Sequence, residues 1–449
     1  MMKLVISVKD KKVFILGWAR SGFEAAKILA KSNTVFITDM KEQDPEQVKE
    51  LETLGVKYKI IDDPIDLLDD SFDVMVKNPG IKYTHPTVVK AKELGIKVIN
   101  EVELGYHYLA KGVKVIGITG SNGKTTTSTL IYKFLEKDGK RVFLGGNIGI
   151  PFCRFVRDIQ TGDYLVIEIS DHQLCDMYEF KTDISVLTNI YEAHTDFHDS
   201  HERYKEMKKR IFNNHTSKDI AIIKYDNKEA MEITRDINST KYYFSRIDKR
   251  NAYLKDNAIY YKDEKIIDTK DIKLQGVHNY ENIMAAIIAV KECGVDNKAI
   301  VNILKSFGGV EHRIEYVATI NGVKYYNDSK ATNCESTKIA LNSFKEPTLL
   351  ILGGLDRGHS FDELVEPMKN VKYVAAYGET RNRIKEFCNK NGFDCDSFET
   401  LKEATMSCNN KANNGDVVLL SPACASWDQY ACFEDRGNEF KDIINSFKK

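Results

Sequence analysis

The chain has 449 residues, 42% of them hydrophobic and 10% aromatic, which is enough for about three packed domains and unlike a disordered protein. The formal net charge is −1 and no basic stripe is present, so the composition disfavours a nucleic-acid partner or a membrane surface. The nine cysteines include no C-x-x-C pair, which predicts reduced thiols rather than disulfides or a zinc site. The N-terminus has no apolar core of a signal peptide, and the longest apolar run, Met284 to Val290, is too short for a membrane helix. We therefore expect a cytoplasmic protein.

Short apolar runs alternate with amphipathic stretches along the chain, which predicts an α/β fold of parallel sheets with crossover helices. The pattern starts three times, so we expect three domains. These are a Rossmann-like domain over 1–101, a central P-loop ATPase-type parallel-sheet domain over 102–309 and a C-terminal Rossmann-like α/β domain over 310–449. The last opens with a hairpin whose turn is Asn321-Gly322.

The first predicted strand ends in LGWARSG, and Asp39 ends the second strand. A dinucleotide-binding turn needs a second glycine so that the backbone can approach the pyrophosphate. Ala19 occupies that position. The turn therefore favours an anion site at Arg20, Ser21 and Gly22 over an NAD site.

The stretch GITGSNGKTTT (117–127) follows a buried strand and opens an apolar-periodic helix, which is the setting of a phosphate-binding loop. Lys124 would reach the outer phosphates and the Thr125 hydroxyl would bind magnesium; the alternative is a tight turn without a ligand. Glu168 ends the strand DYLVIEIS. It either completes the magnesium shell or is an acid in solvent, and the sequence leaves both open.

HTDFHDSH places His194, His198 and His201 close together. The spacing lacks the glutamate of H-E-x-x-H and no thiol lies nearby, so we expect a polar loop with solvated imidazoles rather than a zinc site. His194, at the end of a predicted strand, is the functional candidate among them. The next helix carries Lys208 toward this loop, and a lysine is ordinarily a solvated cation.

In the C-terminal part, YYNDSKATN (325–333) combines an acid, a cation and two hydroxyls where a hairpin leads into a helix. Capping by Asp328 or Ser329 would explain the acid and the hydroxyl. It would not explain Lys330, which opposes the helix dipole and so favours an anionic ligand. SPACASWDQY follows the last predicted buried strand, and the stretch EHR (311–313) places Arg313 at the start of the third predicted domain.

Together, GITGSNGKTTT, GGNIG, HN..N, EHR, NDSKATN and SPACASWDQY resemble the Mur ligase family over essentially the whole chain, and NDSKATN and SPACAS resemble its D-glutamate-adding members. The resemblance implies an ATP-dependent amide ligase of peptidoglycan precursor synthesis. ATP would phosphorylate the alanyl carboxylate of UDP-N-acetylmuramoyl-L-alanine, and the D-glutamate amine would attack the acyl phosphate. It also implies a monomer without nucleic-acid or membrane partners.

The resemblance further implies roles for particular residues. ATP would contact Gly120, Ser121, Asn122, Gly123, Lys124, Thr125, Thr126, Asn279, Asn282, Arg313 and Asp328, and Lys330 would contact the reacting phosphates. The UDP-sugar would contact Arg20, Ser21, Gly22, Asp39, Asn78, Asn147 and His194. D-Glutamate would contact Thr332, Arg357, Ser426 and Phe433. One magnesium would be bound by Thr125 and Glu168, and a second by His194 and an N-carboxylated Lys208. The catalytic set would be Lys124, Glu168, His194, Lys208 and Lys330.

Three positions depart from the family pattern. Ala193 stands where members often carry an acid, Asp171 follows Ser170 where the family has a second serine, and Arg357 stands where a lysine is expected. Another Mur ligase, a folylpolyglutamate synthetase and a nucleotide-binding regulator without activity are the alternatives. The GWARSG domain disfavours the synthetase, and two magnesium sites would serve no purpose in a regulator.

Overall fold

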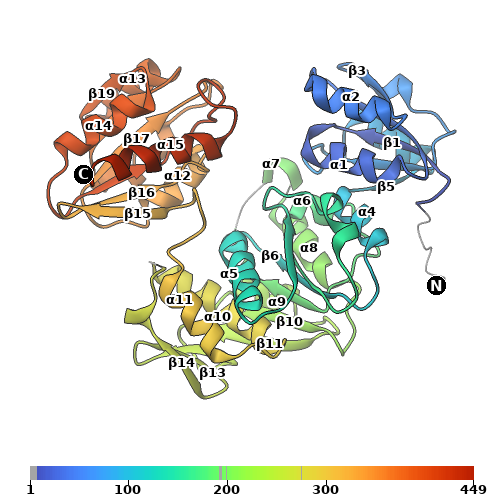
Figure 1. The fold of residues 1–449 in the computed structure, drawn as a ribbon, viewed down its shortest axis with the longest axis horizontal. Coiled ribbons are helices and arrows are strands. Elements are labelled where there is room, and N and C mark those ends of the chain that lie inside the picture. The colour runs from blue at the N-terminus through green and yellow to red at the C-terminus, as the bar shows by residue number, and fades with distance from the viewer. Residues whose placement is uncertain (1–7, 192–194, 199, 275, 449) are drawn as a thin grey trace. The chain divides into compact units, whose positions relative to one another are not determined.

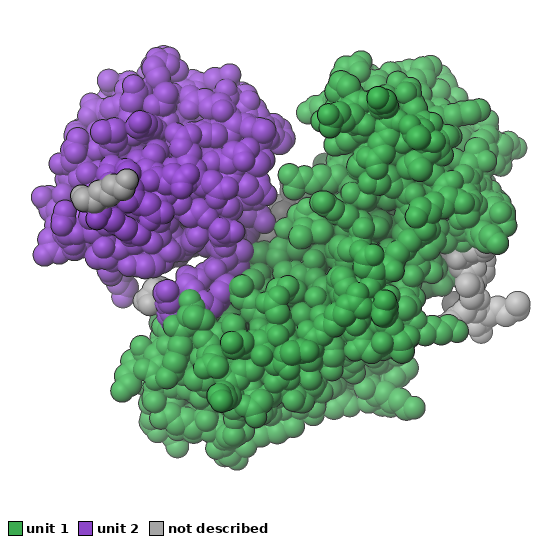
Figure 2. All heavy atoms as spheres, viewed as in Figure 1, with its two compact units in different colours: residues 1–272, 277–306 green, residues 273–276, 307–449 purple. Residues whose placement is uncertain are grey.

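The computed structural model describes residues 8–191, 195–198, 200–274 and 276–448. Its contacts divide the chain into two compact units, one of residues 1–272 and 277–306 and the other of residues 273–276 and 307–449 (Figure 2). No helix among the described residues is both long and apolar enough to span a membrane. The units are α/β throughout, which confirms the expected fold class.

The first sheet is wholly parallel, with strand order β3-β2-β1-β4-β5 (Figure 1). Its strands are β1 (Lys12–Leu16), β2 (Thr34–Asp39), β3 (Lys57–Ile60), β4 (Val74–Lys77) and β5 (Lys97–Ile99), and its helices are α1 (Ala19–Leu29), α2 (Pro45–Thr53) and α3 (Pro86–Glu93). The strand order reverses at β1, and ligands of doubly wound sheets bind outside the carboxyl ends of the strands at such a point.

The central sheet has nine strands in the order β14-β13-β12-β11-β10-β9-β6-β8-β7. From β7 to β12 the pairs are parallel, as expected, whereas β12, β13 and β14 add an antiparallel edge. The strands are β6 (Lys114–Thr119), β7 (Val142–Gly146), β8 (Tyr164–Glu168), β9 (Ile184–Leu187), β10 (Ile220–Lys224), β11 (Thr240–Ser245), β12 (Ala252–Lys255), β13 (Ala258–Tyr261) and β14 (Glu264–Asp268). The helices of this part are α4 (Glu101–Tyr108), α5 (Lys124–Lys137), α6 (Asp171–Leu174), α7 (Thr195–His198), α8 (His201–Lys209), α9 (Lys228–Ile233), α10 (Val277–Lys291) and α11 (Asn297–Ser306).

The first and central sheets belong to one unit, and a buried ion pair joins them. Lys77, at the end of β4, pairs with Asp176 at 3.0 Å, and both side chains are almost fully buried. Such a buried pair is costly to break, so it ties the end of β4 to the central part of the unit. Within the central part, Glu103 of α4 accepts hydrogen bonds from the backbone N–H groups of Glu179 (2.7 Å) and Phe180 (3.0 Å).

The other unit is built on a sheet of order β15-β16-β20-β17-β18-β19. Its strands are β15 (Glu315–Ile320), β16 (Val323–Asn327), β17 (Thr348–Gly353), β18 (Val371–Tyr377), β19 (Cys395–Phe398) and β20 (Val417–Leu420), and its helices are α12 (Cys334–Leu341), α13 (Arg381–Asn391), α14 (Leu401–Lys411) and α15 (Phe433–Ser446). The predicted hairpin is confirmed, since β15 and β16 are antiparallel and Asn321 (φ 51°) and Gly322 (φ 78°) form their turn.

Candidate active site

The phosphate loop lies between β6 and α5, and its glycines fit only without a side chain. A Cβ on Gly120 (φ +141°) would lie 2.0 Å from Thr188 Oγ1, and one on Gly123 (φ +83°) would lie 2.1 Å from Asn282 Oδ1. The backbone N–H groups of Ser121 and Asn122 are taken by Asn189, at 3.0 and 2.9 Å. Because the first N–H groups of a helix point away from its own carbonyls, the start of α5 is the part suited to an anion.

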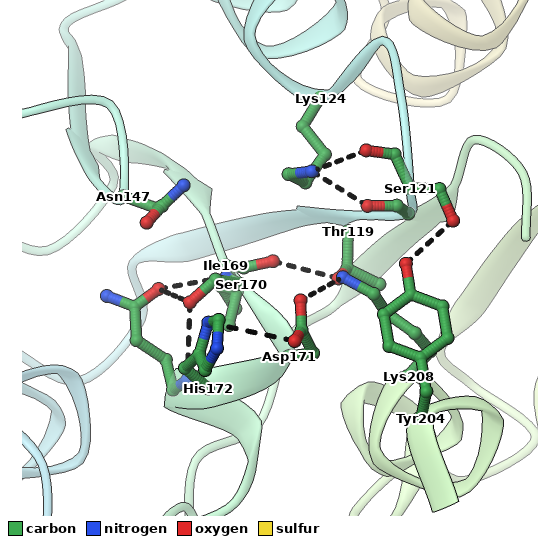
Figure 3. Close-up of polar contacts among 12 residues, drawn as sticks. Thr119, Ser121, Lys124, Asn147, Ile169, Ser170, Asp171, His172, Tyr204 and Lys208 are labelled. Carbon is green, nitrogen blue, oxygen red and sulfur yellow. Dashed lines mark hydrogen bonds and ion pairs between the residues drawn. The ribbon is translucent and has the colours of Figure 1, made fainter. Parts of the chain in front are cut away.

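Lys124 is the first residue of α5, and its side chain folds back over this loop (Figure 3). Its Nζ donates to the carbonyl oxygens of Gly120 (2.8 Å) and Ser121 (2.9 Å). Thr125 follows it in the first turn and is buried. The ammonium thus lies beside the N-terminal turn of α5, where it can meet a phosphate.

Glu168 ends β8 and is paired in register with Ile118 of β6, which leads directly into the phosphate loop. Its side chain is 2% exposed, so the alternative of an acid in solvent is wrong. Oε1 accepts a hydrogen bond from Asn147 Nδ2 (2.9 Å), whereas Oε2 is buried without a hydrogen-bond partner among the described residues. A buried carboxylate oxygen is costly unless something pairs with it, so Glu168 fits a cation next to the loop.

Lys208 is completely buried, contrary to the expectation for an ordinary lysine. Its Nζ lies 3.0 Å from Asp171 Oδ1 and 3.3 Å from Thr119 Oγ1 (Figure 3). Burial lowers the pKa of Lys208, and the charge of Asp171 opposes that shift. The structure therefore places the amino group of Lys208 and the carboxylate of Asp171 beside Thr119, where β6 leads into the phosphate loop.

The histidine cluster is only partly described, because His194 and Ala193 lie outside the described residues. The prediction of solvated imidazoles is wrong for His198, which is fully buried with Nε2 at 2.7 Å from Asp171 Oδ2. His201 is partly exposed, and its Nε2 lies 2.9 Å from Glu229 Oε1.

Asn279 and Asn282 come from α10, which packs on α5. Asn282 Nδ2 donates to Asn279 Oδ1 (3.0 Å), and its Oδ1 accepts from Thr127 Oγ1 (3.5 Å). Since Asn282 also blocks any side chain at Gly123, the structure brings both asparagines to the phosphate loop. Thr126, in the same first turn of α5, is half-buried.

Five of the residues expected to bind the UDP-sugar lie at or just after the carboxyl ends of strands in the first sheet, namely Arg20, Ser21, Gly22, Asp39 and Asn78, whereas Asn147 follows β7 of the central sheet. Asp39 accepts from the backbone N–H of Trp18 (2.7 Å), which precedes α1, and Asn78 Nδ2 donates to Ser21 Oγ (3.3 Å). A Cβ on Gly22 would lie 2.1 Å from the Gly17 carbonyl oxygen, so this contact requires glycine. The side chains of Arg20, in the first turn of α1, and Asn147, which follows β7, are exposed.

In the other unit, Asp328 follows β16 and is buried. Its Oδ2 accepts from Ser421 Oγ (2.7 Å) and its Oδ1 from the backbone N–H of Ile314 (3.1 Å). Burial raises the pKa of Asp328 to about 7. The carboxyl group thus holds the turn after β16 against the end of β20, and Arg313 lies on the chain just before Ile314 with an exposed side chain.

The loop around Lys330 does not begin a helix, which corrects the interpretation from sequence. Asn333 caps α12 by accepting from the Ser336 N–H (2.9 Å), so neither Asp328 nor Ser329 is the cap. Lys330 therefore does not oppose a helix dipole, and that reason for an anionic ligand is wrong. Its ammonium lies 5.5 Å from the centre of the Phe433 ring instead.

The remaining residues expected to bind the amino acid lie on loops of this unit. Ser426 is buried, Thr332 is half-buried, and Phe433 begins α15. Arg357 is exposed, with its guanidinium 4.9 Å from the centre of the Trp427 ring.

Arg436, in the stretch CFEDRGNEF (432–440), is a residue that the sequence analysis did not single out. It is fully buried in α15. Its Nε donates to Ser329 Oγ (2.9 Å), its Nη1 to the Tyr377 hydroxyl (3.3 Å), and its Nη2 to the carbonyl oxygens of Ser329 (2.8 Å) and Cys424 (3.1 Å). One guanidinium therefore ties together NDSKATN, SPACAS and the end of β18.

The chain belongs to the Mur ligase family. The family model for the Mur ligase middle domain matches residues 118–290, and the one for the Mur ligase, glutamate ligase domain matches residues 312–424. Among curated relatives, the UDP-N-acetylmuramoylalanine--D-glutamate ligase of Geobacillus sp. (strain WCH70) is 43% identical over 100% of both chains, and that of Bacillus cereus (strain AH187) is 41% identical over 99% of both.

Solved structures of the family share the fold at low sequence identity. UDP-N-acetylmuramate-alanine ligase MurC from Thermotoga maritima superposes with a TM-score of 0.60 at 18% identity, covering 97% of this chain and 99% of its own. This similarity concerns the fold alone.

Proposed function

We propose that the chain is an ATP- and magnesium-dependent ligase that joins D-glutamate to UDP-N-acetylmuramoyl-L-alanine during synthesis of peptidoglycan precursors. One observation of the structure carries the reaction class: the phosphate loop adjoins Glu168, a buried carboxylate with one oxygen that no described group engages. The full-length relatives that bear the name of a D-glutamate ligase support the choice of amino acid.

The reaction requires activation because a carboxylate would have to lose oxide to form an amide. Transfer of the γ-phosphoryl group of ATP to the alanyl carboxylate gives an acyl phosphate and ADP. The amine of D-glutamate then attacks the carbonyl carbon, phosphate leaves, and the amine gives up a proton. In this proposal the start of α5 and Lys124 hold the outer phosphates of ATP, and Lys330 contacts the group being transferred.

Magnesium, when bound, would neutralise the phosphate oxygens that the substrate carboxylate must approach. We assign Thr125 and Glu168 to one ion, since a hydroxyl and a buried carboxylate are oxygen ligands of the kind magnesium prefers. We assign His194 and an N-carboxylated Lys208 to a second ion. Burial lowers the pKa of Lys208, which favours the neutral amine that adds carbon dioxide.

The three sheets divide the substrates in this proposal. Residues 1–101 bind the uridine diphosphate, through the group at the ends of β1, β2 and β4. Residues 102–309 bind ATP, and residues 310–449 bind D-glutamate through Thr332, Arg357, Ser426 and Phe433. We also propose that the protein is a cytoplasmic monomer that acts on small molecules only.

The decisive experiment measures phosphate release from ATP with UDP-N-acetylmuramoyl-L-alanine and a panel of D- and L-amino acids. We expect release only when both the UDP-sugar and D-glutamate are present, with L-glutamate as the matched control. Release with a different amino acid would make the chain another member of the family. ATP binding without release under any combination would support the regulator that lacks activity.

A further inference from the structure

We propose that Asp171, His172 and His198 form a binding site for a divalent cation that accepts imidazole ligands, such as Mn²⁺, Co²⁺ or Zn²⁺. None of these three residues has a part in the function proposed above. They come from two segments that are distant in sequence, the N-terminal turn of α6 and the end of α7.

The three side chains converge on one point. Asp171 Oδ2 lies 2.7 Å from His198 Nε2 and 3.7 Å from His172 Nδ1. One possible ligand atom from each residue lies within 4.8 Å of the other two. Ligands of a single ion with bonds of about 2.0–2.2 Å lie about 3–4 Å apart, so small side-chain shifts would bring all three into a coordination shell.

The positions of the histidines and the aspartate are fixed by their surroundings. Ser170 caps α6 in a reciprocal pair with Gln173, which sets the direction of Asp171 and His172. The His172 ring packs edge-on against Phe197, with 4.0 Å between ring centres. The site is thus built in advance, with Asp171 and His198 almost fully buried and His172 partly open to solvent.

A second observation concerns the other nitrogen of His198. Its Nδ1 is buried and has no hydrogen-bond partner among the residues that the structure describes. A neutral imidazole that now donates Nε2–H to Asp171 can move its one proton to Nδ1 and present the Nε2 lone pair to a cation. The cation would then take the place of the proton between Nε2 and Oδ2. The change breaks no hydrogen bond at Nδ1, because that nitrogen has none among the described residues.

The two oxygens of Asp171 face different sides. Oδ1 lies 3.0 Å from Lys208 Nζ, while Oδ2 faces the two histidines (Figure 3 shows Asp171 between His172 and Lys208). A cation on the Oδ2 side therefore does not occupy the space between Oδ1 and Lys208. Two nitrogen ligands favour Mn²⁺, Co²⁺ and Zn²⁺ over Mg²⁺, which prefers oxygen ligands and keeps its waters.

The test measures Co²⁺ binding to the full chain by its visible absorption and by titration calorimetry, without nucleotide or substrate. Its result therefore does not depend on whether the proposed ligase function is right. We expect one bound Co²⁺ that a large excess of Mg²⁺ does not displace, and at least about tenfold weaker binding in Asp171→Asn and in His172→Asn. His172 is partly exposed, so its variant tests the site even if Asp171→Asn folds poorly.

His201→Asn is the matched control, because His201 also meets a carboxylate, that of Glu229, but lies outside the cluster. We expect this variant to bind Co²⁺ as the unaltered chain does. The proposal is overturned if the unaltered chain binds no Co²⁺, if His172→Asn binds it as tightly as the unaltered chain, or if His201→Asn loses it to the same extent.

Discussion

Replacing Arg436 with lysine keeps the charge but removes the planar fork that reaches four acceptors on three residues. The guanidinium donates four hydrogen bonds, to Ser329 Oγ, to the carbonyl oxygens of Ser329 and Cys424, and to the Tyr377 hydroxyl. A single ammonium in the same space can serve at most about two of these acceptors. At least two hydrogen bonds to a charged donor are lost, each contributing about 1.5–3 kcal/mol.

We therefore expect Arg436→Lys to lower the free energy of unfolding of its unit by about 3 kcal/mol or more. For a unit of about 150 residues, this corresponds to a fall of at least about 6 °C in its melting temperature. Differential scanning calorimetry of the full chain measures this directly, with the transition of the C-terminal unit compared between the variant and the unaltered chain.

Arg381→Lys is the matched control, since it makes the same change in the same unit. The Arg381 side chain pairs with Glu399, whose carboxylate is 72% exposed, and such surface pairs contribute about 0–1 kcal/mol. Equal falls in melting temperature in the two variants would refute the reasoning, because the buried hydrogen bonds of Arg436 would then contribute no more to stability than the exposed pair of Arg381.

Four further predictions concern the proposed reaction and its pH dependence. Lys124→Ala should nearly abolish turnover while calorimetry still detects binding of the UDP-sugar; retention of most activity would exclude the phosphate-loop assignment. Ser426→Ala should raise the KM for D-glutamate by about ten- to hundredfold, as for a lost hydrogen bond to a charged group, and change that for ATP less; a larger change for ATP would mean that the two sites are exchanged. Lys208→Ala should lose activity that acetate, but not a primary amine, partly restores, because a carboxylate would replace the carbamate; rescue by amines alone would show that the lysine acts as a cation. The pKa of Asp328 is raised from 3.8 to about 7, so between these values the folded state holds a proton that the unfolded state releases. The contribution of this carboxyl to the free energy of unfolding therefore falls as pH rises from about 4 to about 7. The stability of Asp328→Asn relative to the unaltered chain should therefore increase over that range in urea unfolding, and a difference independent of pH would contradict it.

The strands and the phosphate loop could be predicted from sequence because their causes are local. An apolar run followed by a glycine-rich turn and an apolar-periodic helix specifies β6, the loop and α5 within a few residues of one another. The hairpin turn at Asn321-Gly322 is similar, since both residues tolerate a positive φ.

The burial of charged side chains, and the partners that they meet, could not be predicted in this way. Lys208 is buried because Asp171, 37 positions away on another element, receives its charge. Arg436 occupies a helix with acidic neighbours and looks like a surface residue, yet its acceptors come from two loops and from the end of β18. Burial of a charge depends on partners brought together by the fold, and no spacing within one segment encodes them.

The start of α12 shows the same limit at short range. A cap could be assigned to Asp328, Ser329 or Asn333 from residue type alone, since all three are good cap residues. The fold decides among them, because Ser421 and the N–H of Ile314 already engage Asp328, and Arg436 engages Ser329.

The buried ion pair of Lys77 and Asp176 limits how freely the first part of this protein could be exchanged between relatives. A chimaera that took residues 1–101 from another ligase would have to bring a cation to the position of Lys77, or Asp176 would be left buried without its partner. Loss of one member of such a pair costs about 3–5 kcal/mol, which is a large share of the stability of a typical domain. Recombination at this boundary is therefore expected to succeed between parents that match at Lys77 and Asp176, so the nucleotide-sugar module and its neighbour would be inherited together.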